Sequence, residues 1–116
     1  MNIEELRAYC LSKKHVSESF PFDAHTLVFK VANKMFALTG LEDFPPRVNL
    51  KCDPERAISL RESYSEITPG FHMNKKHWNT VLIEGAISSK LLMELIDHSY
   101  DLVFNGLPRK IRDNLN

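Results

Sequence analysis

The chain has 116 residues, 43% of them hydrophobic and 26% charged, which is typical of one folded domain with one core. Lysine plus arginine equals aspartate plus glutamate at 15 each, so the formal net charge is zero with histidine neutral. This balance counts against strong non-specific binding of nucleic acid, although it leaves room for a local basic patch. No apolar run approaches the roughly 20 residues that span a bilayer, and we expect a cytoplasmic monomer.

The first predicted element is a helix over about residues 2–14. Asn2 can cap its start, because the side-chain oxygen can accept a free N–H of the first turn. Ile3, Leu6 and Cys10 follow helical spacing. One face of this helix should therefore be buried against the rest of the protein.

The segment that follows, residues 15–25, looks irregular. Its serines are polar, and Pro21 stands between Phe20 and Phe22. Proline disfavours helical geometry for the residue before it. We expect the two phenylalanine rings to fill the space between the first helix and a sheet.

A β-hairpin gives the clearest strand signal. Residues 26–32 alternate in the period of a strand, with Leu27, Phe29 and Val31 on one face. Asn33-Lys34 is the predicted turn because asparagine tolerates positive φ, and residues 35–39 return as the partner strand.

A third strand is predicted over residues 46–52, which alternate again. Three of its side chains should face inward (Val48, Leu50 and Cys52), and three should face outward (Arg47, Asn49 and Lys51). The outward face of this strand is thus polar and positive.

The second half of the chain is predicted to hold two helices and at least one more strand. Asp53 can cap a helix over residues 53–64, and Ile67 begins an extended segment. A long apolar stripe predicts a helix from Ser88 or Ser89 to about Asn105. The tail that follows is either a short final helix or a loose basic end. The order of elements predicts one α+β domain over residues 1–116, an antiparallel sheet covered by two main helices.

Residues 68–83 contain more groups that can hydrogen-bond, carry charge or stack than any other stretch of the chain. A Pro-Gly turn opens the stretch, and an apolar run typical of a strand closes it. The groups between can neutralise phosphates, hydrogen-bond to bases or stack on them: Asn74, Lys75, Lys76, His77 and Trp78. Lys30, Arg47 and Lys51 are further candidates for phosphate contacts. The alternative is that Trp78 belongs to the core and the lysines are only solvated.

The sequence gives little support for a catalytic site or a metal-binding site. Cys10 and Cys52 have no metal-type spacing and are expected to be small buried side chains. No Gly-x-Ser-x-Gly motif or phosphate-cradling glycine pattern occurs. His72 and His77 supply at most half of a zinc site, which needs about four ligands. We therefore expect no enzyme, no cofactor and no metal.

The chain resembles the MmcQ/YjbR family of small bacterial proteins. Five segments in the same order carry the resemblance: residues 20–31, 34–38, 49–54, 72–81 and 99–103. The resemblance implies a two-layer fold similar to that of CyaY and frataxin, with two main helices on an antiparallel sheet. It also implies DNA binding through a so-called double-wing arrangement.

Two hypotheses of different classes follow. The first is a non-enzymatic DNA-binding or regulatory accessory protein that uses the candidate residues above. The second is a small module that binds another protein or a ligand and does not bind DNA. In that case, His72 and Asn79 would belong to a pocket or docking patch within the same stretch.

Overall fold

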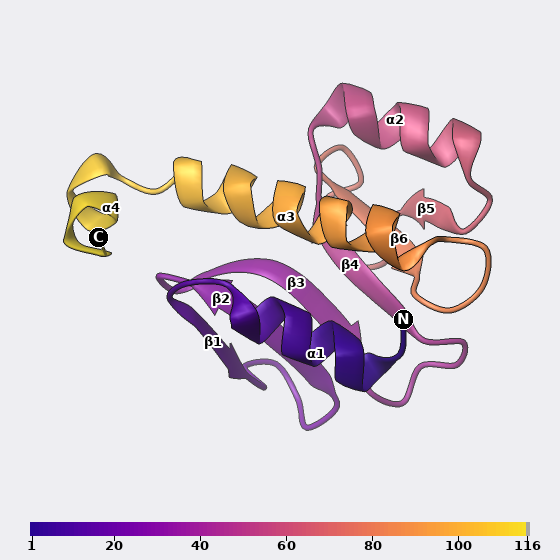
Figure 1. Cartoon of the computed structure of the whole chain (residues 1–116), viewed down its shortest axis with the longest axis horizontal. Coiled ribbons are helices and arrows are strands. Elements are labelled where there is room, and N and C mark those ends of the chain that lie inside the picture. The colour runs from indigo at the N-terminus through magenta and orange to yellow at the C-terminus, as the bar shows by residue number, and fades with distance from the viewer. Residues whose placement is uncertain (116) are drawn as a thin grey trace.

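The computed structural model describes residues 1–115, which fold around one antiparallel sheet (Figure 1). The helices and strands follow the chain in the order α1 (Ile3–Ser12), β1 (Val16–Ser19), β2 (Thr26–Val31), β3 (Lys34–Gly40), β4 (Arg47–Lys51), α2 (Pro54–Ser63), β5 (Ile67–Pro69), β6 (Trp78–Leu82), α3 (Ser89–Asn105) and α4 (Arg109–Leu115). Of the two alternatives for the tail, a short final helix is the one found.

The sheet has six strands in the order β1-β2-β3-β4-β6-β5, and every neighbouring pair is antiparallel. Figure 1 shows α1 and α3 lying over the same face of the sheet, with α4 beyond the end of α3. The predicted α+β class, with two main helices on an antiparallel sheet, is confirmed. Within residues 1–115, no helix has both the length and the apolar character needed to cross a bilayer.

The core lies between the sheet and its two covering helices. Leu6 from α1 and Leu92 from α3 are fully buried in the same cluster as Phe29 and Phe36 from the sheet. Burial alternates along β4 as predicted, so that its odd-numbered residues point to the opposite face. Within residues 1–115, no helix covers that opposite face.

The predicted helix caps at Asn2 and Asp53 are present. The Asn2 side chain accepts a hydrogen bond from Glu5 N at 2.8 Å, and the Glu5 carboxylate accepts one from Asn2 N at 3.2 Å. Asp53 Oδ2 accepts from Arg56 N at 3.1 Å, and Pro54 occupies the first turn of α2. Each cap satisfies N–H groups that the first helical turn leaves free.

The prediction that residues 15–25 are irregular was wrong for β1, which pairs with β2 along its whole length. This short edge strand carries Val16 and Glu18 but no run of apolar residues, so sequence periodicity could not reveal it. Its stability comes from backbone pairing and from α1, since Arg7 Nη2 donates to Glu18 at 2.6 Å. Short edge strands of this kind are specified by tertiary pairing.

The hairpin between β2 and β3 turns one residue earlier than predicted. Ala32 and Asn33 both have positive φ, 47° and 66°, and Val31 pairs with Lys34. Positive φ at both central residues is the signature of a type I′ turn, whose twist matches that of the strands. Asn33 fits this geometry readily, whereas Ala32 is an uncommon choice.

The expectation that Phe20 and Phe22 fill the space beneath the first helix was also wrong. Both rings are exposed, Phe22 with 64% of its surface accessible. Phe20 lies beside Arg7 of α1, whereas Phe22 lines a groove elsewhere, beside Met35 and Leu38 of β3. Core residues on β2 and β3 fill the layer beneath α1, and Phe20 lines a hollow at its edge together with Ile3 and Leu27.

His98 links α3 to the start of α2 and makes stability depend on pH. Its Nε2 accepts a hydrogen bond from Asp53 N at 3.1 Å. Partial burial, followed by the positive charge of Arg56, lowers the pKa of His98, while Asp53 and Asp101 oppose the shift. The unfolded chain therefore takes up a proton more readily than the folded protein, so stability falls as pH drops below the unfolded value of about 6.5.

Urea unfolding at about pH 7.5 and pH 5.5 measures this effect. We expect the wild type to be less stable at the lower pH, and His98→Gln to lose less, because glutamine has an acceptor oxygen but does not titrate. A variant that lost as much stability as the wild type would exclude His98 as the source.

Candidate nucleic-acid interface and adjoining groove

Within residues 1–115, the sheet face opposite α1 and α3 carries no helix, and we call it the open face. Strand alternation places these side chains on it: Thr26, Val28, Lys30, Leu38, Arg47, Asn49, Lys51, Trp78 and Thr80. Three predicted phosphate contacts and the tryptophan thus share one surface. Arg47 lies at one end of that surface, and Lys30 and Lys51 lie at the other end.

The segment that joins β5 to β6 is shaped from within by Asn74. Its side-chain oxygen accepts hydrogen bonds from the backbone N–H groups of Lys76 at 2.9 Å and His77 at 3.3 Å. Gly70 N donates to Trp78 O at 2.9 Å, and a Cβ on Gly70 would lie only 2.8 Å from Trp78 Cβ. The side-chain oxygen of Asn74, which we predicted to hydrogen-bond to nucleic acid, is therefore engaged in hydrogen bonds within the loop.

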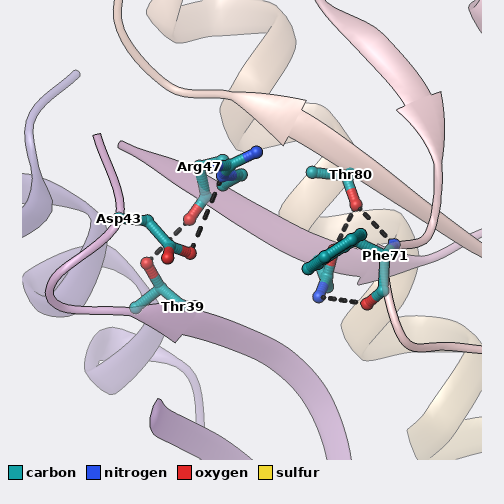
Figure 2. A network of polar contacts seen from close by, with 6 residues as sticks. Thr39, Asp43, Arg47, Phe71 and Thr80 are labelled. Carbon is teal, nitrogen blue, oxygen red and sulfur yellow. Dashed lines mark hydrogen bonds and ion pairs between the residues drawn. The ribbon is translucent and has the colours of Figure 1, made fainter. Parts of the chain in front are cut away.

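Phe71 is anchored over the open face by both of its backbone polar groups (Figure 2). Its N–H donates to Thr80 Oγ1 at 2.9 Å, and its carbonyl accepts from Asn49 Nδ2 at 3.5 Å. The Thr80 hydroxyl in turn donates to Asn49 Oδ1. The Phe71 ring remains 62% exposed and lies against His72, with ring centroids 4.0 Å apart.

Trp78 and Asn79 are buried, on opposite faces of β6. Trp78 is 9% exposed and packs with Val28 and Leu38 on the open face. Asn79 faces the helices, where its Nδ2 donates to Ala57 O of α2 at 3.4 Å. The structure thus gives both residues a packing role, the alternative that the sequence left open for Trp78.

Lys75 makes contacts that fix part of its side chain and backbone. Its Nζ donates to Gly70 O at 3.1 Å, and its carbonyl accepts from Arg61 Nη1 at 2.9 Å. The side chain of Lys76 is exposed on the same loop. Both lysines lie in the loop, shortly before β6 begins.

Six lysines gather at one end of the sheet, which we call the lysine end: Lys14, Lys30, Lys34, Lys51, Lys75 and Lys76. The antiparallel register brings together the ends of β2 and β4 and the starts of β3 and β6. Lys34 and Lys51 line a shared hollow of about 290 Å³ beside Gly106, and Tyr100 near the end of α3 donates to Lys14 O at 2.6 Å.

Carboxylates gather at the opposite end of the sheet, which we call the carboxylate end: Glu4, Asp23, Glu42, Asp43, Glu66 and Glu84. Here β2 and β4 begin and β3 ends, and Met1 at the start of the chain donates to Ile83 O at 3.1 Å. Arg47 belongs to this end, where its Nε lies 3.7 Å from Asp43 Oδ2 (Figure 2). The structure therefore separates Arg47 from Lys30 and Lys51.

The two ends are far enough apart to act independently. The seven residues of β3 connect them, and a strand rises by about 3.3 Å per residue, which gives roughly 20 Å. Charges at physiological salt are screened beyond about 8 Å. Zero net charge thus conceals two local potentials of opposite sign.

Sequence reasoning missed Lys14, Lys34 and most of the residues that line a groove on the open face, although His72, a pocket candidate from the sequence, is one of the lining residues. Neither lysine stands near the dense stretch in sequence, and only the register of the sheet places them beside it. The groove contains the exposed rings of Phe22 and Phe71. Isolated aromatic residues between polar neighbours were a signal for it, which we interpreted instead as packing.

Two observations bear on metal and thiol chemistry. Among residues 1–115, no three His, Cys, Asp or Glu side chains converge in a way that would hold a metal ion. Cys10 and Cys52 are free and buried as predicted, and burial raises the pKa of the Cys10 thiol to about 12. Such a thiol is protonated at neutral pH and is a poor nucleophile.

Proteins of known sequence are similar to this chain over nearly its whole length. Escherichia coli K12 YjbR is 36% identical over 112 residues, covering 97% of this chain and 95% of its own, and is named as uncharacterized. Escherichia coli O157:H7 YbdF is 37% identical over 107 residues, covering 92% of this chain and 88% of its own.

Solved structures agree with this relationship. The Deinococcus radiodurans protein DR2400, described as a DUF419 domain, superposes with a TM-score of 0.92 at 43% identity, covering 98% of this chain and 87% of that one. A Pseudomonas syringae protein gives a TM-score of 0.77 at 30% identity, covering 89% of this chain and 99% of that one. The family model described as YjbR matches residues 11–102. The chain therefore belongs to the YjbR family.

Proposed function

We propose that this protein is a non-enzymatic DNA-binding or regulatory protein that contacts nucleic acid through its lysine end. The observation that carries the proposal is the convergence of six lysines from the turn after α1, the sheet and the loop before β6. Asp53 at the start of α2 and Asp101 of α3 are carboxylates on the adjoining elements, and the six lysines outnumber them. Neutralising phosphates releases counterions, which supplies most of the sequence-independent affinity for DNA.

The lysines are spread widely enough to reach different phosphates. Lys30 on β2 and Lys51 on β4 are separated by β3, which corresponds to about 10 Å across two strand spacings. The groups best suited to reading bases, Asn74 and Trp78, are occupied by the loop and the core. Contacts to phosphate position a protein without reading sequence, so we expect binding with little sequence preference and a steep salt dependence.

Fluorescence anisotropy of a short labelled duplex between about 50 and 200 mM salt tests the proposal. We compare the wild type with the double variant Lys34→Ala/Lys76→Ala, which removes two exposed charges of the lysine end. The variant should bind at least about tenfold more weakly at low salt. The slope of log affinity against log salt should fall by about two, one for each lost phosphate contact.

Lys90→Ala is the control, because it removes an exposed cation near the start of α3, outside the lysine end. We expect it to bind like the wild type. Absence of wild-type binding at low salt, or an equal loss in the control and the double variant, would show that the lysine end is not a nucleic-acid surface.

A second candidate function is a small ligand-binding module without DNA binding. A specific observation favours it: the open face holds a groove of about 520 Å³, within the range of sites for small molecules. The groove meets the lysine end at Met35, but the carboxylates that line it, Asp23, Glu42 and Asp43, belong to the carboxylate end. The two candidates therefore make separate predictions.

A further inference from the structure

The groove runs along β3 on the open face and has two loops as its walls. Met35, Leu38 and Gly40 of β3 form its floor. One wall is the loop that contains Phe22, and the other is the loop that contains Phe71. The groove is therefore built from three segments far apart in sequence.

Both walls present aromatic rings to solvent. Phe22 is 64% exposed and Phe71 is 62% exposed, although their own loops are held firmly. Phe71 is fixed by its bonds to Asn49 and Thr80, and Asp23 fixes the other loop by accepting from the N–H groups of His25 and Thr26. Exposed rings on fixed backbone at a concave site are typical of ligand contact.

The charge of the groove is negative. Asp23, Glu42 and Asp43 line it, and the hydrogen bonds to Asp23 hold the pKa of that carboxyl below its ordinary value. His25 Nδ1 lies 3.1 Å from Glu42 Oε1, and Arg47 offsets one carboxylate at 3.7 Å from Asp43. At neutral pH with neutral histidines, three negative charges face one positive charge, so the site repels anions such as phosphate.

We propose that the groove binds a small organic cation with an apolar or aromatic body. Its ammonium group is placed beside Asp43 and Glu42, where the carboxylates supply the opposite charge. Its body lies on Leu38 and Met35 between the rings of Phe22 and Phe71, which also attract cations through their π faces. This inference rests on the ligand-binding candidate and is independent of DNA binding at the lysine end.

Three probes of similar size and different charge test the inference: benzyltrimethylammonium, benzyl alcohol and phenylacetate. Amide chemical shifts of the full chain are followed by NMR during titration. The cation should shift the amides of residues 22–26, 40–43 and 71–73. It should bind at least about tenfold more tightly than phenylacetate, and benzyl alcohol should lie between them.

Matched variants assign the two parts of the site. Phe22→Ala should weaken binding of the cation, whereas Phe44→Ala should not, since Phe44 is 89% exposed and lies outside the groove. Glu42→Gln/Asp43→Asn should remove the preference for the cation, whereas Glu62→Gln on the exposed surface of α2 should preserve it. Each variant is checked for an unchanged amide spectrum elsewhere, so that unfolding is not mistaken for lost binding.

The outcomes separate the inference from the candidate on which it rests. Equal binding of all three probes in the groove would overturn the preference for cations and leave a ligand-binding groove in place. No shift at the groove with any probe would overturn both. Neither result bears on the salt-dependent binding of a duplex, which is measured separately.

Discussion

Replacing Trp78 with alanine is expected to lower the free energy of unfolding by about 3–5 kcal/mol. The ring is 9% exposed and packs with Val28 and Leu38, so its removal leaves a cavity beneath the loop that precedes β6. Urea unfolding followed by far-UV circular dichroism measures the change. Trp78 is the only tryptophan, so its fluorescence cannot serve as the probe.

Phe71→Ala is the matched control on the same face. Because its ring is 62% exposed, we expect a loss of less than about 1 kcal/mol. If Trp78→Ala were no more costly than Phe71→Ala, the tryptophan would not be a core residue, and a stacking role on nucleic acid would be restored.

The second large effect is expected at Ser99, a fully buried residue of α3. Its hydroxyl accepts from Lys51 N at 2.9 Å and donates to Phe36 O at 2.5 Å, and so bridges β3 and β4 beyond their last paired residues. Ser99→Ala leaves a backbone donor and a backbone acceptor without this partner. Each unsatisfied buried group costs about 1–3 kcal/mol.

Ser89→Ala at the exposed start of α3 is the corresponding control, and its expected effect is within about 0.5 kcal/mol. Thermal unfolding of both variants provides the comparison. A Ser99→Ala variant as stable as the Ser89→Ala variant would mean that water or a shifted backbone replaces the bridge. Ser99 lies in one of the five segments that carry the resemblance to the family. Its bridge between β3 and β4 is a structural role for a residue of that segment.

Elements with strong local signals were predicted well. The caps at Asn2 and Asp53 depend on hydrogen bonds three residues away, and alternation in β4 follows from one buried face. Local chemistry is sufficient for such features. It was not sufficient for β1, whose pairing with β2 joins residues from Ser19 and Val28 to Val16 and Val31, well beyond the reach of local signals.

The candidate site was predicted only in part, for a physical reason. Lys30 and Lys51 were identified from outward strand positions. Which charged side chains lie beside them depends on which strand ends meet in the sheet. Antiparallel register brings Lys34 beside Lys51 and removes Arg47 to the carboxylate end. Composition cannot reveal this separation, because opposite charges at two ends sum to the same zero as charges evenly mixed.

The groove shows the same limit. Phe22 and Phe71 are 49 residues apart in the numbering of the chain, and both face it only because two loops approach β3 from opposite sides. Side chains that appear to be packing residues in sequence can thus remain exposed when other residues fill the core. The expectation for Phe22 failed for this reason.

An amide chemical-shift map of the protein with a short DNA duplex at low salt tests whether the lysine end binds DNA. We expect shifts at the end of β2, the start of β3, the end of β4 and the loop before β6, where the lysine end lies. We expect little change in the loops of the carboxylate end. Shifts confined to the carboxylate end or to the outer surfaces of the helices, or no shifts, would contradict this expectation.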